Sequence, residues 1–182
     1  IIIDESANFD IAVPGIVFGS VGTAGQRCTT TRRILVHESR MEELQKKLIK
    51  AYKQIPVGNP LDPKTLMGPI IDEKSVQNIE KAIQSVKDAG GKILCGGKRL
   101  GDTGHYFEPT IAIADNHWDI VQDETFGPLL YLIPCKSLSD ALLKQNDVKQ
   151  GLSSAIFTDN LQNAETFLSS LGSDCGIANV NI

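Results

Sequence analysis

The stretch Leu129-Leu130-Tyr131-Leu132-Ile133-Pro134 is apolar throughout, and it indicates the fold class. A short helix is expected soon after it, over 139–146, and a second apolar run follows at Leu152–Phe157. Strands that are apolar on both faces need cover on both faces, and their alternation with helices favours parallel pairing. The stretch therefore predicts a three-layer α/β fold, a mostly parallel sheet with helices on both faces. In such sheets, ligands are expected at the carboxyl ends of the strands.

The rest of the chain continues this alternation. A helix rich in small apolar residues is expected over 9–21, before a glycine-rich turn at 22–25. Ser39 and Glu42 have the spacing of a capping box, which predicts that a helix begins at Ser39. The other expected helices cover 73–89 and 161–171, and the other expected strands cover 29–36, 92–95, 106–112 and 176–182.

Composition narrows the class of protein. A chain of 182 residues with 41% hydrophobic content can bury one core, so one domain is expected. The net charge of −4 is spread as mixed charges, which disfavours nucleic acid or an anionic membrane as a partner. The four cysteines are far apart and the three histidines lack metal-ligand spacing, so no metal site is predicted. The apolar first residues and the strand-like last residues suggest a fragment of a longer chain.

The most unusual local sequence is Gly22-Thr23-Ala24-Gly25-Gln26-Arg27-Cys28-Thr29. Glycines let the backbone bend so that the Cys28 thiol and its own N–H face one cavity. The neighbouring cation Arg27 favours a thiolate, and the N–H of Cys28 is suited to stabilise an oxyanion. Taken alone, the pattern leaves two interpretations open: a nucleophilic cysteine, or a buried structural one.

Five stretches together resemble the aldehyde dehydrogenase superfamily over the whole chain. Gly25-Gln26-Arg27-Cys28 is similar to the family's nucleophile motif, and Glu124-Thr125-Phe126-Gly127-Pro128 is similar to its second signature. The other three, which occur in the family's order, are 56–60 with 67–70, 107–110 and 151–154. The resemblance implies that residues 1–182 form an incomplete catalytic, nucleophile-bearing domain, with NAD-binding and oligomerisation parts outside this chain.

The same resemblance implies a mechanism and roles for site residues. Cys28 would attack an aldehyde to give a thiohemiacetal, hydride would pass to NAD, and water would release the acid from a thioester. Glu124 would bind the nicotinamide ribose hydroxyls, and Phe126 would pack near the nicotinamide. The alternatives, judged from residue type alone, are an exposed loop carboxylate and a core aromatic residue.

Within the superfamily, 23–33 and 172–182 are most similar to the antiquitin group. That group oxidises α-aminoadipic semialdehyde in lysine breakdown, and Arg27 matches an arginine that helps to hold the charged end of this substrate. A guanidinium can bind a carboxylate through two hydrogen bonds. The alternative is that Arg27 favours the thiolate form of the cysteine or pairs with a nearby acid. The expectation that the cofactor is NAD rather than NADP depends only on the resemblance to the family.

The resemblance also implies a homo-oligomer, a dimer or tetramer, in the full-length protein. We expect a cytoplasmic enzyme, with the mitochondrion as the alternative, and we expect the 182 residues alone to be inactive. Two other functions stay open. One is a cysteine hydrolase or acyltransferase, which needs a histidine within hydrogen-bond reach of Cys28. The other is a non-catalytic module of the same fold.

Overall fold

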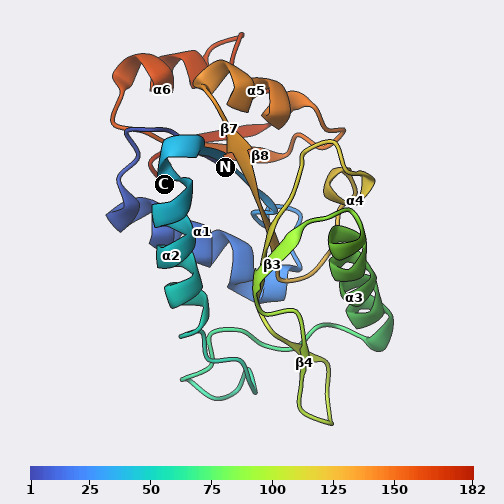
Figure 1. The fold of residues 1–182 in the computed structure, drawn as a ribbon. Coiled ribbons are helices and arrows are strands. Elements are labelled where there is room, and N and C mark those ends of the chain that lie inside the picture. Colours follow the sequence, from blue (N-terminus) through green and yellow to red (C-terminus); the bar gives the residue numbers. More distant parts are fainter.

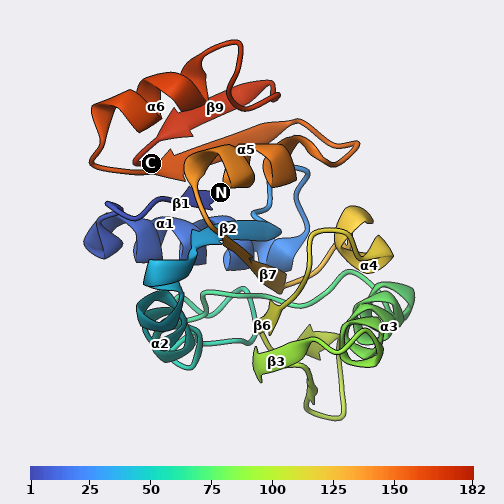
Figure 2. The ribbon, with the colours of Figure 1, turned by 45° about the horizontal axis from the view of Figure 1, so that its top comes forward.

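The computed structural model describes all 182 residues, and it has one principal sheet of seven strands. The sheet has the order β3-β6-β7-β2-β1-β8-β9, which Figure 2 shows running from β3 near the bottom to β9 at the top. All neighbours in it are parallel except β3, which pairs antiparallel with β6 at one edge. The predicted α/β class with a mostly parallel sheet is confirmed.

The elements alternate along the chain as expected. The strands of this sheet are β1 (Ile2–Ile3), β2 (Arg33–His37), β3 (Lys92–Cys95), β6 (Thr110–Ile113), β7 (Leu129–Cys135), β8 (Ser153–Phe157) and β9 (Ile177–Val180), and a separate hairpin pairs β4 (Arg99–Leu100) with β5 (Tyr106–Phe107). The helices are α1 (Phe9–Val21), α2 (Met41–Tyr52), α3 (Glu73–Asp88), α4 (Asp119–Gln122), α5 (Leu138–Asn146) and α6 (Leu161–Leu168), with 3-10 turns at Gly22–Gly25 and Glu38–Arg40.

Helices cover both faces of the sheet, so the three-layer prediction also holds. Figure 1 shows α5 and α6 on one side of the central strands, with α1 and α2 on the other. Helix α3 packs against the edge strand β3. The central strands are inaccessible to water: Ile34, Leu35 and Val36 of β2 are 0% exposed. Their burial on both faces explains why these strands are apolar throughout.

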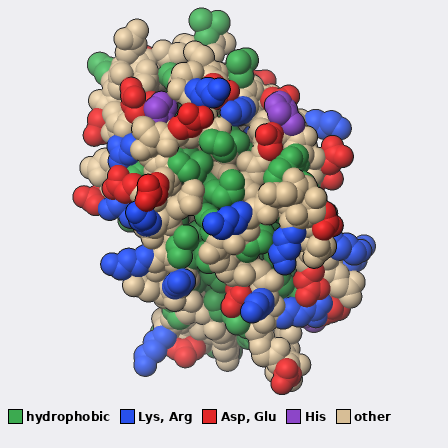
Figure 3. Space-filling model, viewed as in Figure 1, with side chains coloured by type: hydrophobic (Ala, Val, Ile, Leu, Met, Phe, Trp, Pro, Cys, Tyr) green, Lys and Arg blue, Asp and Glu red, His purple; other side chains and the backbone are tan.

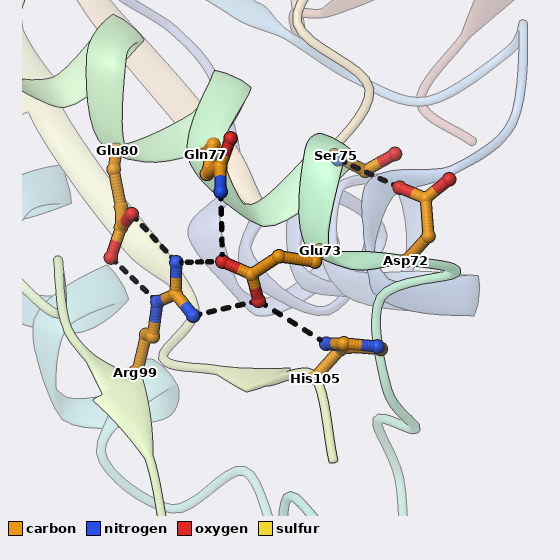
Figure 4. Close-up of polar contacts among 7 residues, drawn as sticks. All are labelled: Asp72, Glu73, Ser75, Gln77, Glu80, Arg99 and His105. Atoms are coloured by element: carbon orange, nitrogen blue, oxygen red, sulfur yellow. Dashed lines mark hydrogen bonds and ion pairs between the residues drawn. The ribbon is translucent and has the colours of Figure 1, made fainter.

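Charged side chains of both signs are mixed over the face of the molecule in Figure 3. One group of them holds the β4–β5 hairpin against α3. Arg99 of β4 pairs with Glu73 at 2.6 Å and with Glu80 at 2.7 Å, and His105 lies 3.6 Å from Glu73 (Figure 4). We call Arg99, Glu73 and Glu80 the hairpin cluster.

The predicted capping box at Ser39 is wrong. A 3-10 turn occupies Glu38–Arg40, and α2 begins two residues later than expected, at Met41. The His37 side chain accepts the N–H of Ser39 and caps this turn, while Glu42 pairs with Lys46. A histidine two residues upstream therefore replaces the expected serine cap.

Three predicted boundaries also change. The strand expected over 106–112 is broken at Pro109, which has no N–H to donate to a ladder, into β5 and β6. The strand expected over 29–36 begins only at Arg33, because Thr30 closes a turn by donating its N–H to Arg27 O. Helix α6 ends at Leu168, three residues earlier than expected.

Candidate active site

The turn before Cys28 has an unusual backbone. Thr23, Ala24 and Gly25 have φ angles of +53°, +54° and +72°, which lie in the left-handed region that side chains with a Cβ rarely adopt. The N–H of Gln26 then donates to Thr23 O at 3.1 Å and closes the turn. Two non-glycine residues in this region imply that surrounding contacts hold the backbone there.

Gly25 lies against the second signature. A Cβ on Gly25 would fall 2.0 Å from the carbonyl oxygen of Gly127 and 2.8 Å from the nitrogen of Pro128. No side chain fits that space. The glycine therefore permits contact between two motifs that are about a hundred residues apart in the sequence.

Gln26 joins the turn to a third motif. Its side-chain amide donates to Thr23 O and to Pro69 O, each at 3.2 Å, and its oxygen accepts the N–H of Ile71 at 2.9 Å. Both ends of the amide are used. The segment around residue 70 is thereby fixed beside the turn.

Arg32 makes the densest set of contacts in this region. Its Nε donates to Glu124 Oε1 at 3.2 Å, its Nη2 donates to Arg27 O at 3.1 Å, and its Nη1 donates to Gly25 O at 3.4 Å. Nη1 also donates to the carbonyl of Thr125, and the guanidinium carbon lies 4.7 Å from the centre of the Phe126 ring. We call Arg32, Glu124 and Phe126, with these carbonyls, the turn cluster.

The Arg32 side chain is 13% exposed. Burial lowers the pKa of its guanidinium from the ordinary value, and the negative charge of Glu124 opposes this shift. The charge of Cys28 is the smallest cause, and it also opposes the lowering of the Arg32 pKa.

Cys28 and Glu124 both line a cavity of about 680 Å³. Its walls come from α1, the 28–33 and 121–124 segments, and the starts of β8 and β9. Cys175 lines it too, with its thiol 3.4 Å from Ser154 Oγ and 3.3 Å from Ile177 O. A volume of this size is ample for a small organic substrate.

The side chain of Cys28 is exposed to the cavity, and its backbone N–H has no acceptor within the protein. An exposed thiol with a free neighbouring N–H is the pairing that covalent attack on a carbonyl needs, because the developing oxyanion requires a donor. The alternative of a buried structural cysteine is thus wrong for Cys28. It fits Cys135, whose thiol is buried and whose pKa is raised to about 12 by that burial.

The comparisons with known proteins agree with this geometry. The model of the aldehyde dehydrogenase family matches residues 1–182. The chain belongs to the aldehyde dehydrogenase family. Aldehyde dehydrogenase family 7 member B4 of Arabidopsis thaliana is 46% identical over the whole chain, and the α-aminoadipic semialdehyde dehydrogenase of Mus musculus is 45% identical. The chain spans about a third of the length of these relatives, 36% and 34% respectively.

Solved structures that are more than 30% identical to the chain have the same fold. HpcC from Thermus thermophilus superposes on 99% of the chain with a TM-score of 0.94 and 34% identity, and the chain covers 36% of it. A betaine aldehyde dehydrogenase from Staphylococcus aureus, solved in complex with NAD+, superposes on 99% of the chain with a TM-score of 0.93 and 32% identity. The chain covers 36% of that protein as well.

The position of the cavity corrects one expectation. The segments that line it precede β2, β7, β8 and β9, so the cavity lies at the amino ends of the parallel strands rather than the carboxyl ends. At the carboxyl ends the chain passes from β7 to α5 through only residues 136–137, and from β8 to α6 through 158–160. The longer connections are at the amino ends, where they leave room for this cavity.

The other predicted site residues lie in different places. Glu124 is on the cavity wall, with its side chain 34% exposed. Phe126 is 44% exposed and stacks with Arg32 outside the cavity lining. Arg27 is exposed beside Cys28, makes no ion pair and does not itself line the cavity. Their roles toward cofactor and substrate stay predictions.

Nothing in the structure favours the hydrolase alternative. His37 contacts Ser39, His105 contacts Glu73 and His117 contacts Asp147, and none of the three lines the cavity. Cys28 therefore has no histidine partner.

No group of three or more His, Cys, Asp or Glu side chains has the geometry to hold a metal ion. No helix has both the length and the apolar character needed to span a bilayer.

Two residues of this site were not singled out from the sequence. Gln26 and Arg32 were quoted within motifs, but neither was assigned a function. Their roles depend on contacts with residues about 45 and 90 positions away. An arginine pair at 32–33 just after a candidate nucleophile was the only local signal, and it does not reveal that Arg32 meets Glu124 whereas Arg33 meets Asn116 and two backbone carbonyls.

Proposed function

We propose that this chain is the nucleophile-bearing part of an enzyme that oxidises an aldehyde to a carboxylic acid with NAD+, and that Cys28 is the nucleophile. The observation that carries the proposal is the exposed Cys28 thiol, with its unbonded N–H, on the wall of the same cavity as Glu124. Membership of the aldehyde dehydrogenase family supports it.

The residues of this chain suit the first step, the attack on the aldehyde. The Cys28 sulfur attacks the aldehyde carbon and forms a thiohemiacetal, and the Cys28 N–H is placed to stabilise the new oxyanion. NAD+ supplies the acceptor for the hydride that leaves this carbon. The thioester left on Cys28 then reacts with water, which releases the acid and regenerates the thiol. In the net reaction, aldehyde, water and NAD+ become acid, NADH and a proton.

The fit of the cofactor to this chain depends on Glu124. Its Oε1 accepts from Arg32, while its Oε2 has no hydrogen-bond partner in the protein. A carboxylate oxygen left free on a cavity wall is suited to accept from the paired hydroxyls of a ribose. Phe126 lies beside it, two residues further on, and offers an apolar ring.

The direct test measures NADH formation by the full-length protein. The Cys28→Ala variant should lose turnover by roughly 10³-fold or more, because covalent catalysis is removed. Cys175→Ala is the matched control, since Cys175 lines the same cavity but its thiol already has partners. Turnover that survives in Cys28→Ala, or that vanishes equally in Cys175→Ala, would refute Cys28 as the nucleophile.

For the substrate we propose α-aminoadipic semialdehyde. Support comes from the 45% identity to the mouse enzyme of that name and from Arg27, an exposed guanidinium without an ion pair one residue from the nucleophile. Such a group can bind a carboxylate in two-point fashion beside the nucleophile. We also propose that the full-length protein is a homo-oligomer and that it is located in the cytoplasm.

The substrate proposal makes a selective prediction. Arg27→Met should raise the KM for α-aminoadipic semialdehyde by about tenfold, the effect of one lost charge-assisted contact, and leave the KM for propanal unchanged. An equal change for both aldehydes would show that Arg27 acts on the thiol rather than on the substrate. No change for either would exclude it from both roles.

A further inference from the structure

Arg32 stands out because one guanidinium contacts both the turn that carries Cys28 and the segment that carries Glu124. On the nucleophile side it donates to Gly25 O and Arg27 O, which precede Cys28 in the chain. On the other side it donates to Glu124 Oε1 and Thr125 O and stacks on Phe126. The two segments are about ninety residues apart in the sequence.

The geometry of these contacts needs the planar fork of an arginine. Three different nitrogens reach acceptors that lie in different directions, and the flat face of the group covers the Phe126 ring. A lysine has one nitrogen and no flat face, so it can satisfy only part of this set. Because the Arg32 side chain is 13% exposed, water competes weakly for these acceptors.

The contact with Glu124 uses one carboxylate oxygen and leaves the other free. Arg32 fixes Oε1, so the free Oε2 has a defined direction along the cavity wall. Without Arg32, Glu124 would be a loop side chain with no other hydrogen-bond partner in the protein.

We infer that Arg32 is a positioning residue that sets Glu124 and Phe126 at a fixed place relative to Cys28, and so determines affinity for the dinucleotide. This inference rests on the proposed function, since it deepens the role of the same site. Arg32 itself lines the cavity, but in this inference it does not bind the cofactor directly. Its effect passes through Glu124.

The test uses the full-length protein and measures the Kd for NAD+ together with kcat and both KM values. Arg32→Met should weaken NAD+ binding roughly tenfold, the scale of one charge-assisted hydrogen bond, with the aldehyde KM changed less than about twofold. Arg32→Lys keeps the charge but loses the fork, and it should keep most of the defect. Arg32→Lys with wild-type NAD+ affinity would overturn the positioning role.

A double-mutant cycle checks that the effect passes through Glu124. Glu124→Gln should weaken NAD+ binding by itself, and adding Arg32→Met to it should change the Kd much less than the same substitution does in the wild type. Losses that simply multiply would overturn the inference. This readout separates positioning from a general loss of stability, which would act equally in both backgrounds.

The chain offers a matched control in Arg40. Its guanidinium also stacks on an aromatic ring, that of Phe9 at 4.3 Å, donates to a carbonyl, that of Glu5, and pairs with a carboxylate, that of Glu43 at 3.4 Å. It does not line the cavity. Arg40→Met should leave the Kd for NAD+ unchanged.

The failure of this inference can be told from failure of the proposed function. A wild-type protein that neither binds NAD+ nor reduces it with any aldehyde would refute the proposed function, and the inference with it. A wild-type protein that is active, with Arg32→Met binding NAD+ as tightly, would refute only the role of Arg32.

Discussion

Two arginine clusters join distant parts of this chain, and they differ in what they hold together. In the hairpin cluster, Arg99 contacts only side-chain carboxylates, and all three side chains are 39–48% exposed (Figure 4). In the turn cluster, Arg32 contacts one carboxylate, three backbone carbonyls and an aromatic ring, and is 13% exposed.

The pKa values of the two arginines shift in opposite directions. Hydrogen bonds to Glu80 and Glu73 raise the pKa of Arg99, whereas burial lowers the pKa of Arg32. Exposed ion pairs contribute little to stability, because water and salt screen them. The comparison indicates that the hairpin cluster is a surface attachment, whereas the turn cluster fixes the course of the backbone beside Cys28.

The largest expected effect comes from the glycine at the centre of the turn cluster. Gly25→Ala places a Cβ 2.0 Å from Gly127 O at a φ of +72°, so the turn and the second signature must move apart. We expect a loss of about 3 kcal/mol or more in the free energy of unfolding, and loss of NADH formation. Denaturant unfolding and turnover of the full-length protein measure both.

Gly22→Ala is the matched control for that substitution. Gly22 begins the same turn, but it has a φ of −53° and nothing within 4 Å of an added Cβ. It should remain stable and active. If both variants behave alike, the close approach at Gly25 is not what shapes the turn.

The next effect compares the arginines directly. Arg32→Met should lower the free energy of unfolding by about 1–3 kcal/mol, since carbonyls that are partly buried lose their donor. Arg99→Met, measured in the same way, should cost clearly less. A larger loss in the free energy of unfolding for Arg99→Met than for Arg32→Met would contradict the contrast between the two clusters.

Salt should sharpen the same difference. Raising the ionic strength from about 0.1 M to 1 M shortens the Debye length to roughly 3 Å, which screens exposed pairs. The gap in stability between wild type and Arg99→Met should then close, whereas the gap for Arg32→Met should persist. Denaturant titrations at both salt concentrations provide the measurement, and equal salt sensitivity for the two variants would contradict the assignment.

The smallest expected effect is a pH dependence of the hairpin cluster. Hydrogen bonds from Arg99 lower the pKa values of Glu73 and Glu80 below their ordinary value of 4.5. A lowered folded pKa means that the unfolded chain binds protons first, so the contribution is present above about pH 4.5 and is lost as the pH falls through the lowered values. Between about pH 5 and pH 3, Arg99→Met should lose less stability than wild type in low salt, as acid titrations of both proteins followed by denaturant unfolding would measure.

Local sequence predicted most of the fold, and it failed where a distant or unexpected partner intervened. Helix α1 occupies the predicted residues 9–21, because its apolar residues and the Asn8 cap are local signals. The capping box at Ser39 failed, because the His37 side chain took the Ser39 N–H instead. The strand expected over 106–112 was also wrong, although residue type alone could have indicated the break at Pro109, since a proline cannot donate to a ladder.

The candidate site divides in the same way. Cys28 and Glu124 were found from their motifs, and the structure places both on one cavity. The contacts made by Gln26 and Arg32 could not be predicted, because the local sequence around a side chain does not identify a hydrogen-bond partner about 45 or 90 residues away. The general tendency of parallel sheets also predicted the wrong end of the strands for the cavity.

The sequence by itself determined the α/β class, the family and the nucleophile candidate, because apolar runs and short motifs are local properties. Only the tertiary structure decided that the cavity opens at the amino ends of the strands, since this depends on which connections are long once the strands are side by side. Only the tertiary structure brought Arg32 to Glu124 and Gly25 to Gly127. Packing of the sheet sets these distances, and the spacing of residues along the chain does not.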